Sequence, residues 1–270
     1  MQSPFKIVFF DIDWTLYDHK NHCWPESALS SIKKLQAEGI KVVLCTARPF
    51  HSLDRFGVND LGIAWDGYVS SAGGVAYADH QYLRKLLMKD ADVASFIKAA
   101  HERHLTLEIV GPLDRILLFP QTYSSRKFYR AYHESIPSLG SYSGQEVVAF
   151  NFFAPKSRDK EMTSLFPQLI YSRYFDYAVD VMPAPHLKGE ACDDILRHYG
   201  FKKEESLGFG DDLQDISIAE HDGVGGNLCG PRYLRDWHKE GTRRSFDRCP
   251  QRDFERPLPS GDHVSRSPFR

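Results

Sequence analysis

Near the start of the sequence, a short apolar segment is followed directly by two carboxylates. The segment Lys6 to Phe10 is continuously apolar after its first residue, and Asp11-Ile12-Asp13 follows it directly. Such a run without alternation is typical of a strand that is covered on both faces, as in parallel sheets. In open α/β sheets ligands bind at the carboxyl ends of the strands. The sequence therefore predicts an α/β fold with an acidic site at this edge.

Strand and helix signals alternate over the next part of the chain. From Pro25 the apolar residues Leu29, Ile32 and Leu35 recur at helical spacing until Gly39. A second buried strand is predicted from Ile40 to Cys45, and a third from Asp66 to Ser71, closed by the turn at Gly73-Gly74. This alternation favours a parallel-sheet, Rossmann-like core.

The pattern changes between about Tyr82 and Met182, where an α+β module is predicted to be inserted into the core. Its expected helices cover 90–104 and 123–134, and its expected strands cover 106–110, 116–119 and 147–153. A helix over 188–198 and a strand over 206–209 then resume the core pattern. The predicted domains are a first core part (1–81), the inserted module (82–183), a second core part (184–229) and a tail (230–270).

The tail has a different composition from the rest of the chain. Residues 230–270 hold nine arginines and one lysine against six acidic residues, a net charge of +4, and few aliphatic residues. Such a segment buries a helix or strand face poorly. One hypothesis is that a frameshift has replaced the original ending. The other is a natural disordered basic arm that meets an anionic partner.

Composition limits the partners and the compartment. The 270 residues carry 34 basic and 36 acidic side chains, a formal charge of -2, so no global field indicates nucleic acid as a partner. No apolar run approaches the roughly 18 residues needed to span a bilayer, so we expect a cytoplasmic protein without a membrane partner. The five cysteines are widely spaced and are expected to be free thiols. The sequence does not indicate the oligomeric state.

Further polar residues follow the other predicted strands and begin a helix. Thr46 closes the second strand, Lys188 begins the helix after the inserted module, and Asp211 and Asp215 follow the last strand. Each of these alone is commonly only a solvated residue. Together with Asp11 and Asp13 they indicate a site for an anion and a cation, because clustered carboxylates repel one another unless a cation relieves them. Hard oxygen ligands of this kind suit Mg²⁺.

These motifs resemble those of the haloacid dehalogenase superfamily of phosphohydrolases, specifically its Cof-like sugar-phosphatase branch. The family motifs are Asp-x-Asp-Gly-Thr, a threonine after the second strand, a lysine, and Gly-Asp-x-x-Asn-Asp. The matching segments here are Asp11-Ile12-Asp13-Trp14-Thr15, Thr46-Ala47-Arg48, Lys188-Gly189 and Gly210-Asp211-Asp212-Leu213-Gln214-Asp215. The resemblance covers roughly residues 5–229 and implies that the inserted module is a large α+β cap.

The resemblance implies a Mg²⁺-dependent phosphatase of small phosphorylated metabolites, with a role for each matching residue. Asp11 would be the nucleophile that forms an aspartyl-phosphate, and Asp13 the general acid and base. Thr46 and Lys188 would hold the phosphoryl oxygens. The implied metal residues are Asp11, Asp13, Asp211 and Asp215, and the implied substrate-binding residues are Thr46, Ala47, Arg48, Lys188 and Gln214.

The chain departs from the family pattern at several positions. Trp14 stands where the family has glycine, Ala47 replaces another glycine, and Gln214 replaces an asparagine. These changes leave open a non-catalytic protein that binds phosphorylated metabolites and keeps the carboxylates. A phospho-acceptor signalling domain also uses clustered acids, a Thr and a Lys, but such domains usually have about 120 residues and lack an inserted cap.

Overall fold

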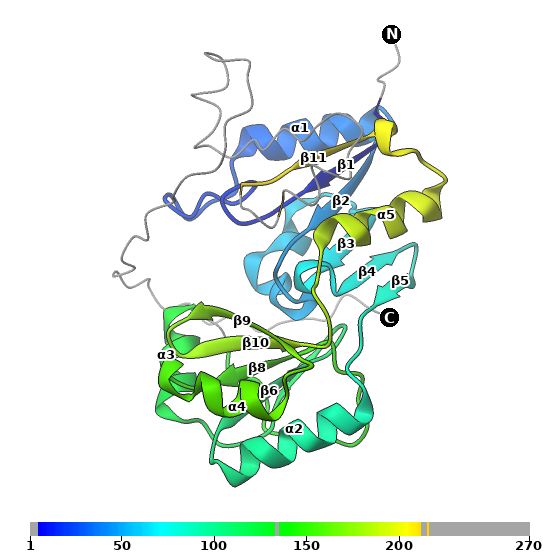
Figure 1. Cartoon of the computed structure of the whole chain (residues 1–270). Coiled ribbons are helices and arrows are strands. Elements are labelled where there is room, and N and C mark those ends of the chain that lie inside the picture. Colours follow the sequence, from blue (N-terminus) through cyan, green and yellow to red (C-terminus); the bar gives the residue numbers. More distant parts are fainter. Residues whose placement is uncertain (1–4, 133–134, 212–214, 216–270) are drawn as a thin grey trace, which may run out of the picture.

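The computed structural model describes residues 5–132, 135–211 and 215, and in it the chain forms a core and a cap (Figure 1). The core is built on a six-stranded sheet with the order β11-β1-β2-β3-β4-β5. Its strands are β1 (Ile7–Phe10), β2 (Lys41–Cys45), β3 (Gly67–Ser70), β4 (Val75–Ala78), β5 (Gln81–Lys85) and β11 (Ser206–Phe209). β11, β1, β2 and β3 are parallel, and β4 and β5 continue the sheet antiparallel.

Two helices cover the opposite faces of this sheet, which explains the continuous apolar run of β1. Val8 and Phe10 pack with Ile32 of α1 (Glu26–Ala37). Ile7 and Phe9 face the other way and pack against α5 (Lys188–Tyr199). Both faces of β1 are therefore buried, as the sequence predicted.

Several short 3-10 helices complete the core. They are η1 (Phe50–Ser52), η2 (Asp54–Phe56), η3 (Val58–Leu61), η4 (Ser71–Gly73) and η6 (Lys203–Glu205). The first three follow β2 and bring Phe56 toward the start of the loop after β1, where its ring contacts Tyr17.

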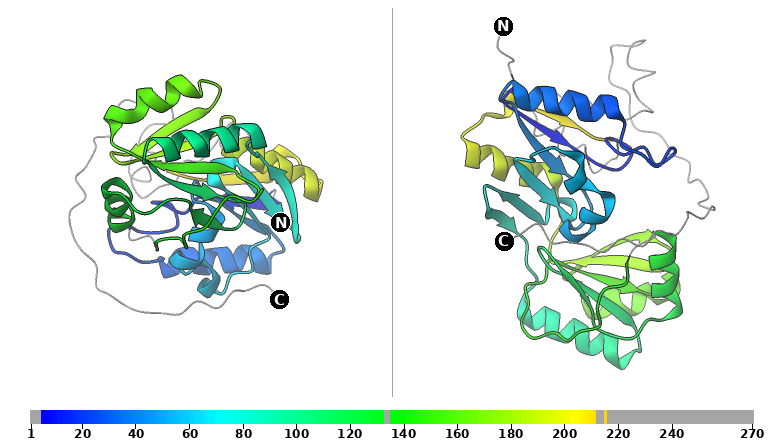
Figure 2. Two further views of the ribbon diagram at one scale, coloured as in Figure 1. Left: turned by 90° about the horizontal axis from the view of Figure 1, so that it is seen from below. Right: turned by 180° about the vertical axis from the view of Figure 1, so that it is seen from behind.

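The cap is an antiparallel sheet with the order β7-β6-β8-β10-β9. Its strands are β6 (Thr106–Val110), β7 (Arg115–Leu117), β8 (Ala149–Phe153), β9 (Ile170–Phe175) and β10 (Ala178–Met182). α2 (Asp90–Glu102) and α4 (Asp159–Leu165), which follows η5 (Lys156–Arg158), pack on one face in a single core cluster. α3 (Tyr123–Ala131) packs on part of the other face. Figures 1 and 2 show α2 and α4 on the side of the cap sheet that is turned away from the core.

The two chain crossings between core and cap meet at the turn after β3. The Leu86 amide donates to the Gly74 carbonyl at 2.8 Å, and His186 Nδ1 donates to the Ser71 carbonyl at 2.8 Å. A Cβ atom on Gly73 would lie 2.4 Å from the Leu187 carbonyl oxygen. Glycine at this position therefore lets the returning chain pass close to the turn.

The predicted fold class is confirmed: a Rossmann-like α/β core carries an inserted α+β cap. β5 still belongs to the core sheet, so the first core part extends to Lys85 rather than ending at residue 81. The predicted tail, 230–270, lies outside the described residues. Within the described residues Cys23, Cys45 and Cys192 are free thiols. Among those same residues no helix has both the length and the apolar character needed to cross a membrane.

Candidate active site

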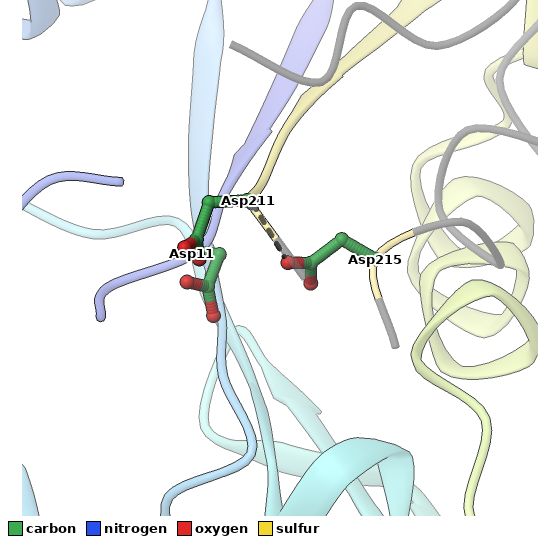
Figure 3. A group of neighbouring side chains, drawn as sticks. All are labelled: Asp11, Asp211 and Asp215. Carbon is green, nitrogen blue, oxygen red and sulfur yellow. Dashed lines mark hydrogen bonds between the residues drawn. The ribbon is translucent and has the colours of Figure 1, made fainter. Parts of the chain in front are cut away.

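Carboxylates from two neighbouring parallel strands meet at the carboxyl edge of the core sheet. Asp11 follows β1 and Asp211 follows β11 by one residue, and β1 pairs with β11 in parallel. Asp11, Asp211 and Asp215 each offer a carboxylate oxygen, and these atoms lie within 4.8 Å of one another. Figure 3 shows the three carboxyl groups gathered at this edge. The topology thus brings together acids that are about 200 residues apart in the chain.

A buried lysine joins two of these carboxylates. Lys188, the first residue of α5, is 3% exposed, and its Nζ donates to Asp11 Oδ1 at 2.7 Å and to Asp215 Oδ1 at 2.6 Å. Burial alone would lower the pKa of Lys188, but the charges of Asp11 and Asp215 outweigh it and raise that pKa. Lys188 is therefore a fixed positive charge beside Asp11.

The environment of Asp11 opposes its ionisation. Asp11 is 4% exposed, and burial raises its pKa to about 7, with a further increase from Asp215, although the Lys188 charge acts in the opposite direction. A second cation beside Asp11 would favour the ionised carboxylate.

Gly210 allows Asp215 to fold back against the strand end. The Asp215 side chain is 1% exposed, and its Oδ2 accepts a hydrogen bond from the Asp211 amide at 3.0 Å. A Cβ atom on Gly210 would lie 2.4 Å from the Asp215 Cβ. A residue with a side chain at position 210 would therefore clash with Asp215, which explains why glycine precedes Asp211.

Asp13 is held by two basic side chains. Arg48 donates from Nε to Asp13 Oδ2 at 2.8 Å and from Nη2 to Oδ1 at 2.7 Å, and His19 Nε2 lies 2.6 Å from Oδ1. Burial acts to raise the pKa of Asp13, but the hydrogen bonds from His19 and Arg48 outweigh it and lower the pKa to about 2. In this arrangement Asp13 is a carboxylate at neutral pH.

The predicted substrate-binding residues other than Lys188 differ in their burial and in their contacts with the site. Thr46 is fully buried, and its Oγ1 accepts from the Arg48 amide at 3.1 Å, which places it at the same edge. Ala47 is exposed. The Arg48 guanidinium lies 3.6 Å from the Phe56 ring centroid while it binds Asp13. Gln214 lies outside the described residues.

Neither the contact of His19 with Asp13 nor the backbone conformation of Trp14 was predicted from the sequence. His19 lies six residues after Asp13, and its ring contacts the Trp14 ring in a tilted arrangement, with centroids 5.0 Å apart. Trp14 has φ 62°, in the left-handed region that favours glycine. The family motif has glycine at position 14, and this was the signal in the sequence for a left-handed backbone conformation there. No sequence pattern indicated that His19 contacts Asp13.

The chemistry of the donor set fits a hard divalent cation. Asp11, Asp211 and Asp215 supply only oxygen atoms, and Lys188 is bonded to Asp11 and Asp215. A divalent cation among these carboxylates would relieve their mutual repulsion and favour the ionised form of Asp11. Oxygen donors in this number suit Mg²⁺ together with water molecules.

A strand-end nucleophile candidate, a buried lysine and a Gly-Asp motif beneath an inserted cap define a hydrolase of the haloacid dehalogenase type. Residues 8–226 match the family model described as haloacid dehalogenase-like hydrolase. The chain belongs to this family.

Known proteins with related sequences or folds cover most of the chain. A relative from Bacillus subtilis (strain 168), named "Putative phosphatase YkrA", is 25% identical over 224 residues, which are 82% of this chain and 84% of that protein. The phosphoglycolate phosphatase of Sulfolobus acidocaldarius is 22% identical over 225 residues, 81% of each chain. The solved structure of the sugar phosphatase BT4131, of haloacid dehalogenase subclass IIB, is similar with a TM-score of 0.64 and 26% identity. The similarity covers 82% of this chain and 86% of that chain.

Proposed function

We propose that the protein is a Mg²⁺-dependent phosphatase that hydrolyses small phosphorylated metabolites, such as sugar phosphates, through an aspartyl-phosphate. The observation that carries this proposal is the contact of Lys188 with Asp11 beside two further carboxylates at one sheet edge. Relatives named as phosphatases and the similarity to a sugar phosphatase support the same reaction class.

Asp11 is the proposed nucleophile. Its carboxylate oxygen attacks the phosphorus, the bond from phosphorus to the ester oxygen breaks, and the leaving oxygen takes a proton from Asp13. Asp13 then removes a proton from water, which attacks the phosphorus and releases inorganic phosphate and free Asp11. Lys188 and Thr46 offer donors to the phosphoryl oxygens.

Asp13 requires a rearrangement before the first proton transfer. Arg48 and His19 keep it ionised in the observed arrangement, which suits its action as a base. Donation of a proton requires the contact with Arg48 to open, because the guanidinium stabilises the ionised form.

Mg²⁺ would be held by the carboxylates of Asp11 and Asp211 and by the backbone carbonyl of Asp13, with Asp215 orienting the site. When bound, it supplies positive charge that offsets the charge of the phosphoryl group in the transition state. Asp215 already orients Lys188 and the Asp211 amide, as expected of a residue that supports others.

The proposal is tested by turnover of p-nitrophenyl phosphate. We expect Mg²⁺-dependent hydrolysis that EDTA abolishes and that falls at least about a thousandfold in Asp11→Asn, since this change removes the nucleophile. Asp60→Asn, at an exposed aspartate of η3, is the matched control and should keep full activity. Undiminished turnover in Asp11→Asn would overturn the proposal.

A non-catalytic phosphometabolite-binding protein is the second candidate. The observation that favours it is the two-point contact of Arg48 with Asp13, because it holds the proposed acid in its ionised form. Calorimetry that detects Mg²⁺ and sugar-phosphate binding without any turnover would select this candidate over the phosphatase.

A further inference from the structure

Two cysteines that are far apart in the sequence face each other inside the core. Cys45 is the last residue of β2, and Cys192 lies in the second turn of α5. Their Sγ atoms are 3.6 Å apart, and the two residues are 0% and 2% exposed. The sulfur atoms of a disulfide are about 2.05 Å apart, so these two would have to approach by about 1.5 Å. We refer to Cys45 and Cys192 as the thiol pair.

The thiol pair lies in the apolar layer between the core sheet and α5. Cys45 points to the face of β2 that α5 covers, whereas its neighbour Leu44 points to the face that α1 covers. Ile195 of α5 belongs to the same apolar cluster as the thiol pair. Cys23, by contrast, is exposed. Packing thus holds the two sulfur atoms of the pair against each other and away from bulky reagents in solvent.

Each cysteine of the pair is joined through the backbone to a residue of the candidate active site. Thr46 directly follows Cys45, and Lys188 lies one helical turn before Cys192. Residues four apart share one face of a helix, and both Lys188 and Cys192 are buried. Cys45 is also among the groups that raise the pKa of Lys188, so it lies near the Lys188 ammonium. A movement of the thiol pair would therefore displace both donors proposed for the phosphoryl oxygens.

We propose that Cys45 and Cys192 are a redox modification site, at which a reversible disulfide switches the active site off. The loss of activity rests on the proposed phosphatase function, whereas formation of the disulfide does not. Because the core is closely packed, closing the gap between the sulfurs shifts the end of β2 relative to the first turns of α5. Thr46 and Lys188 move with these elements, and a displacement of about 1 Å at a catalytic site can lower the rate about a hundredfold.

Hydrogen peroxide is the proposed oxidant, because it is little larger than a water molecule. One sulfur of the pair attacks a peroxide oxygen, the O–O bond breaks, and a sulfenic acid and one water form. The other sulfur attacks the sulfenic sulfur, the S–O bond breaks, and a second water leaves. The two thiols thereby lose two electrons and two protons, which reduce one peroxide to two waters. A dithiol such as dithiothreitol restores both thiols by exchange and is itself oxidised to a disulfide.

Peptide mapping without reduction tests whether the disulfide forms. The reduced full-length chain is treated with hydrogen peroxide, blocked with N-ethylmaleimide, digested and analysed by mass spectrometry. We expect a cross-linked pair of peptides that contain Cys45 and Cys192 and that dithiothreitol separates. Turnover of p-nitrophenyl phosphate by the same samples should fall at least about tenfold on oxidation and return after dithiothreitol treatment.

Single cysteine variants connect the loss of turnover to the thiol pair. Cys45→Ala and Cys192→Ala each remove one sulfur, so both should be active when reduced and should lose much less activity under peroxide than the unaltered chain does. Cys23→Ala, at an exposed cysteine, is the matched control and should remain as sensitive as the unaltered chain.

The outcomes separate this inference from the proposed function. Absence of the cross-linked peptides, or a cross-link that leaves turnover unchanged, overturns the inference and leaves the phosphatase proposal intact. An equal loss of activity in Cys45→Ala, Cys192→Ala and the unaltered chain also overturns it. Absence of turnover in the reduced chain contradicts the phosphatase proposal, and the peptide map then still decides whether the thiol pair is a site of oxidation.

Discussion

At the residue scale, the unusual position is Trp14, directly after the proposed acid and base. Its φ of 62° is the conformation that glycine adopts easily and that costs other residues about 1–2 kcal/mol. The indole contacts His19, and His19 in turn binds Asp13. Trp14 thus strains the backbone, and its indole also supports the His19 ring that binds Asp13.

The backbone strain at Trp14 can be isolated by comparing Trp14→Gly with Trp14→Ala, because both changes remove the indole. We expect the glycine variant to be more stable than the alanine variant by about 1 kcal/mol in urea unfolding. The same pair of changes at the exposed helical residue Ser30 should show the opposite order, since alanine favours a helix. Equal stability of the two Trp14 variants would contradict the left-handed conformation.

At the element scale, the site depends on how β11 ends. The Gly210 backbone leaves room for the Asp215 side chain, and Asp215 then binds Lys188 at the start of α5. Gly210 therefore allows the end of β11 and the first turn of α5 to be joined through Asp215.

Gly210→Ala should disrupt this arrangement, because the added Cβ would meet the Asp215 side chain at 2.4 Å. We expect a loss of about 2 kcal/mol in stability, typical of forced displacement in a packed region, and a loss of most phosphatase activity. Gly140→Ala is the matched control, since its Cβ would make an ordinary 3.6 Å contact with Ile116. Thermal unfolding and p-nitrophenyl phosphate turnover measure both effects, and similar values for the two variants would refute the steric role.

Some strands of the core and cap could be predicted from the sequence, and others could not. β1 and β2 were predictable because their continuous apolar runs stand directly before polar site residues. β9 was missed because none of its residues is fully buried and the polar residues Ser172 and Arg173 interrupt its apolar pattern. Its register depends on pairing with β10. The hairpin of β4 and β5 was missed because the Gly73-Gly74 turn was interpreted as closing the third strand, and no strand was predicted between this turn and the inserted module.

In the candidate active site, the positions of the motif residues could be predicted from the sequence, but the hydrogen-bond partners of their side chains could not. The spacing of Asp11, Lys188 and Asp211 along strand and helix ends indicated one edge of the sheet. The pairing of Arg48 with Asp13 depends on side-chain directions in two loops, which no sequence period encodes.

At the scale of the whole molecule, the proposed metal site joins segments from both core parts on either side of the cap insertion. Asp11 comes from the first part, and Asp211 and Asp215 come from the second. A bound cation should therefore stabilise the assembled core, and the effect should depend on the ionisation of Asp11.

We expect Mg²⁺ to raise the melting temperature by about 3 °C or more at pH 8 and by less at pH 6. Burial raises the folded-state pKa of Asp11 from 3.8 to about 7, so the Asp11 carboxyl carries a proton below pH 7. The free energy of unfolding therefore decreases as pH rises through 7, because the buried carboxyl must then ionise. Mg²⁺ needs the ionised carboxylate, and protons compete with it at pH 6. EDTA should reverse the shift, whereas a larger shift at pH 6 would contradict this description of Asp11.

Asp11 is proposed to carry the phosphoryl group during hydrolysis, and trapping this phosphorylated intermediate examines that role without relying on a loss of activity. The full-length chain is mixed with p-nitrophenyl phosphate and Mg²⁺, quenched in acid within milliseconds to seconds, digested and analysed by mass spectrometry. If Asp11 is the nucleophile, the peptide that contains Asp11 carries a hydroxylamine-sensitive phosphoryl group, and the same peptide of Asp11→Asn carries none. Turnover without this modified peptide, or the same modification in Asp11→Asn, would rule out Asp11 as the nucleophile.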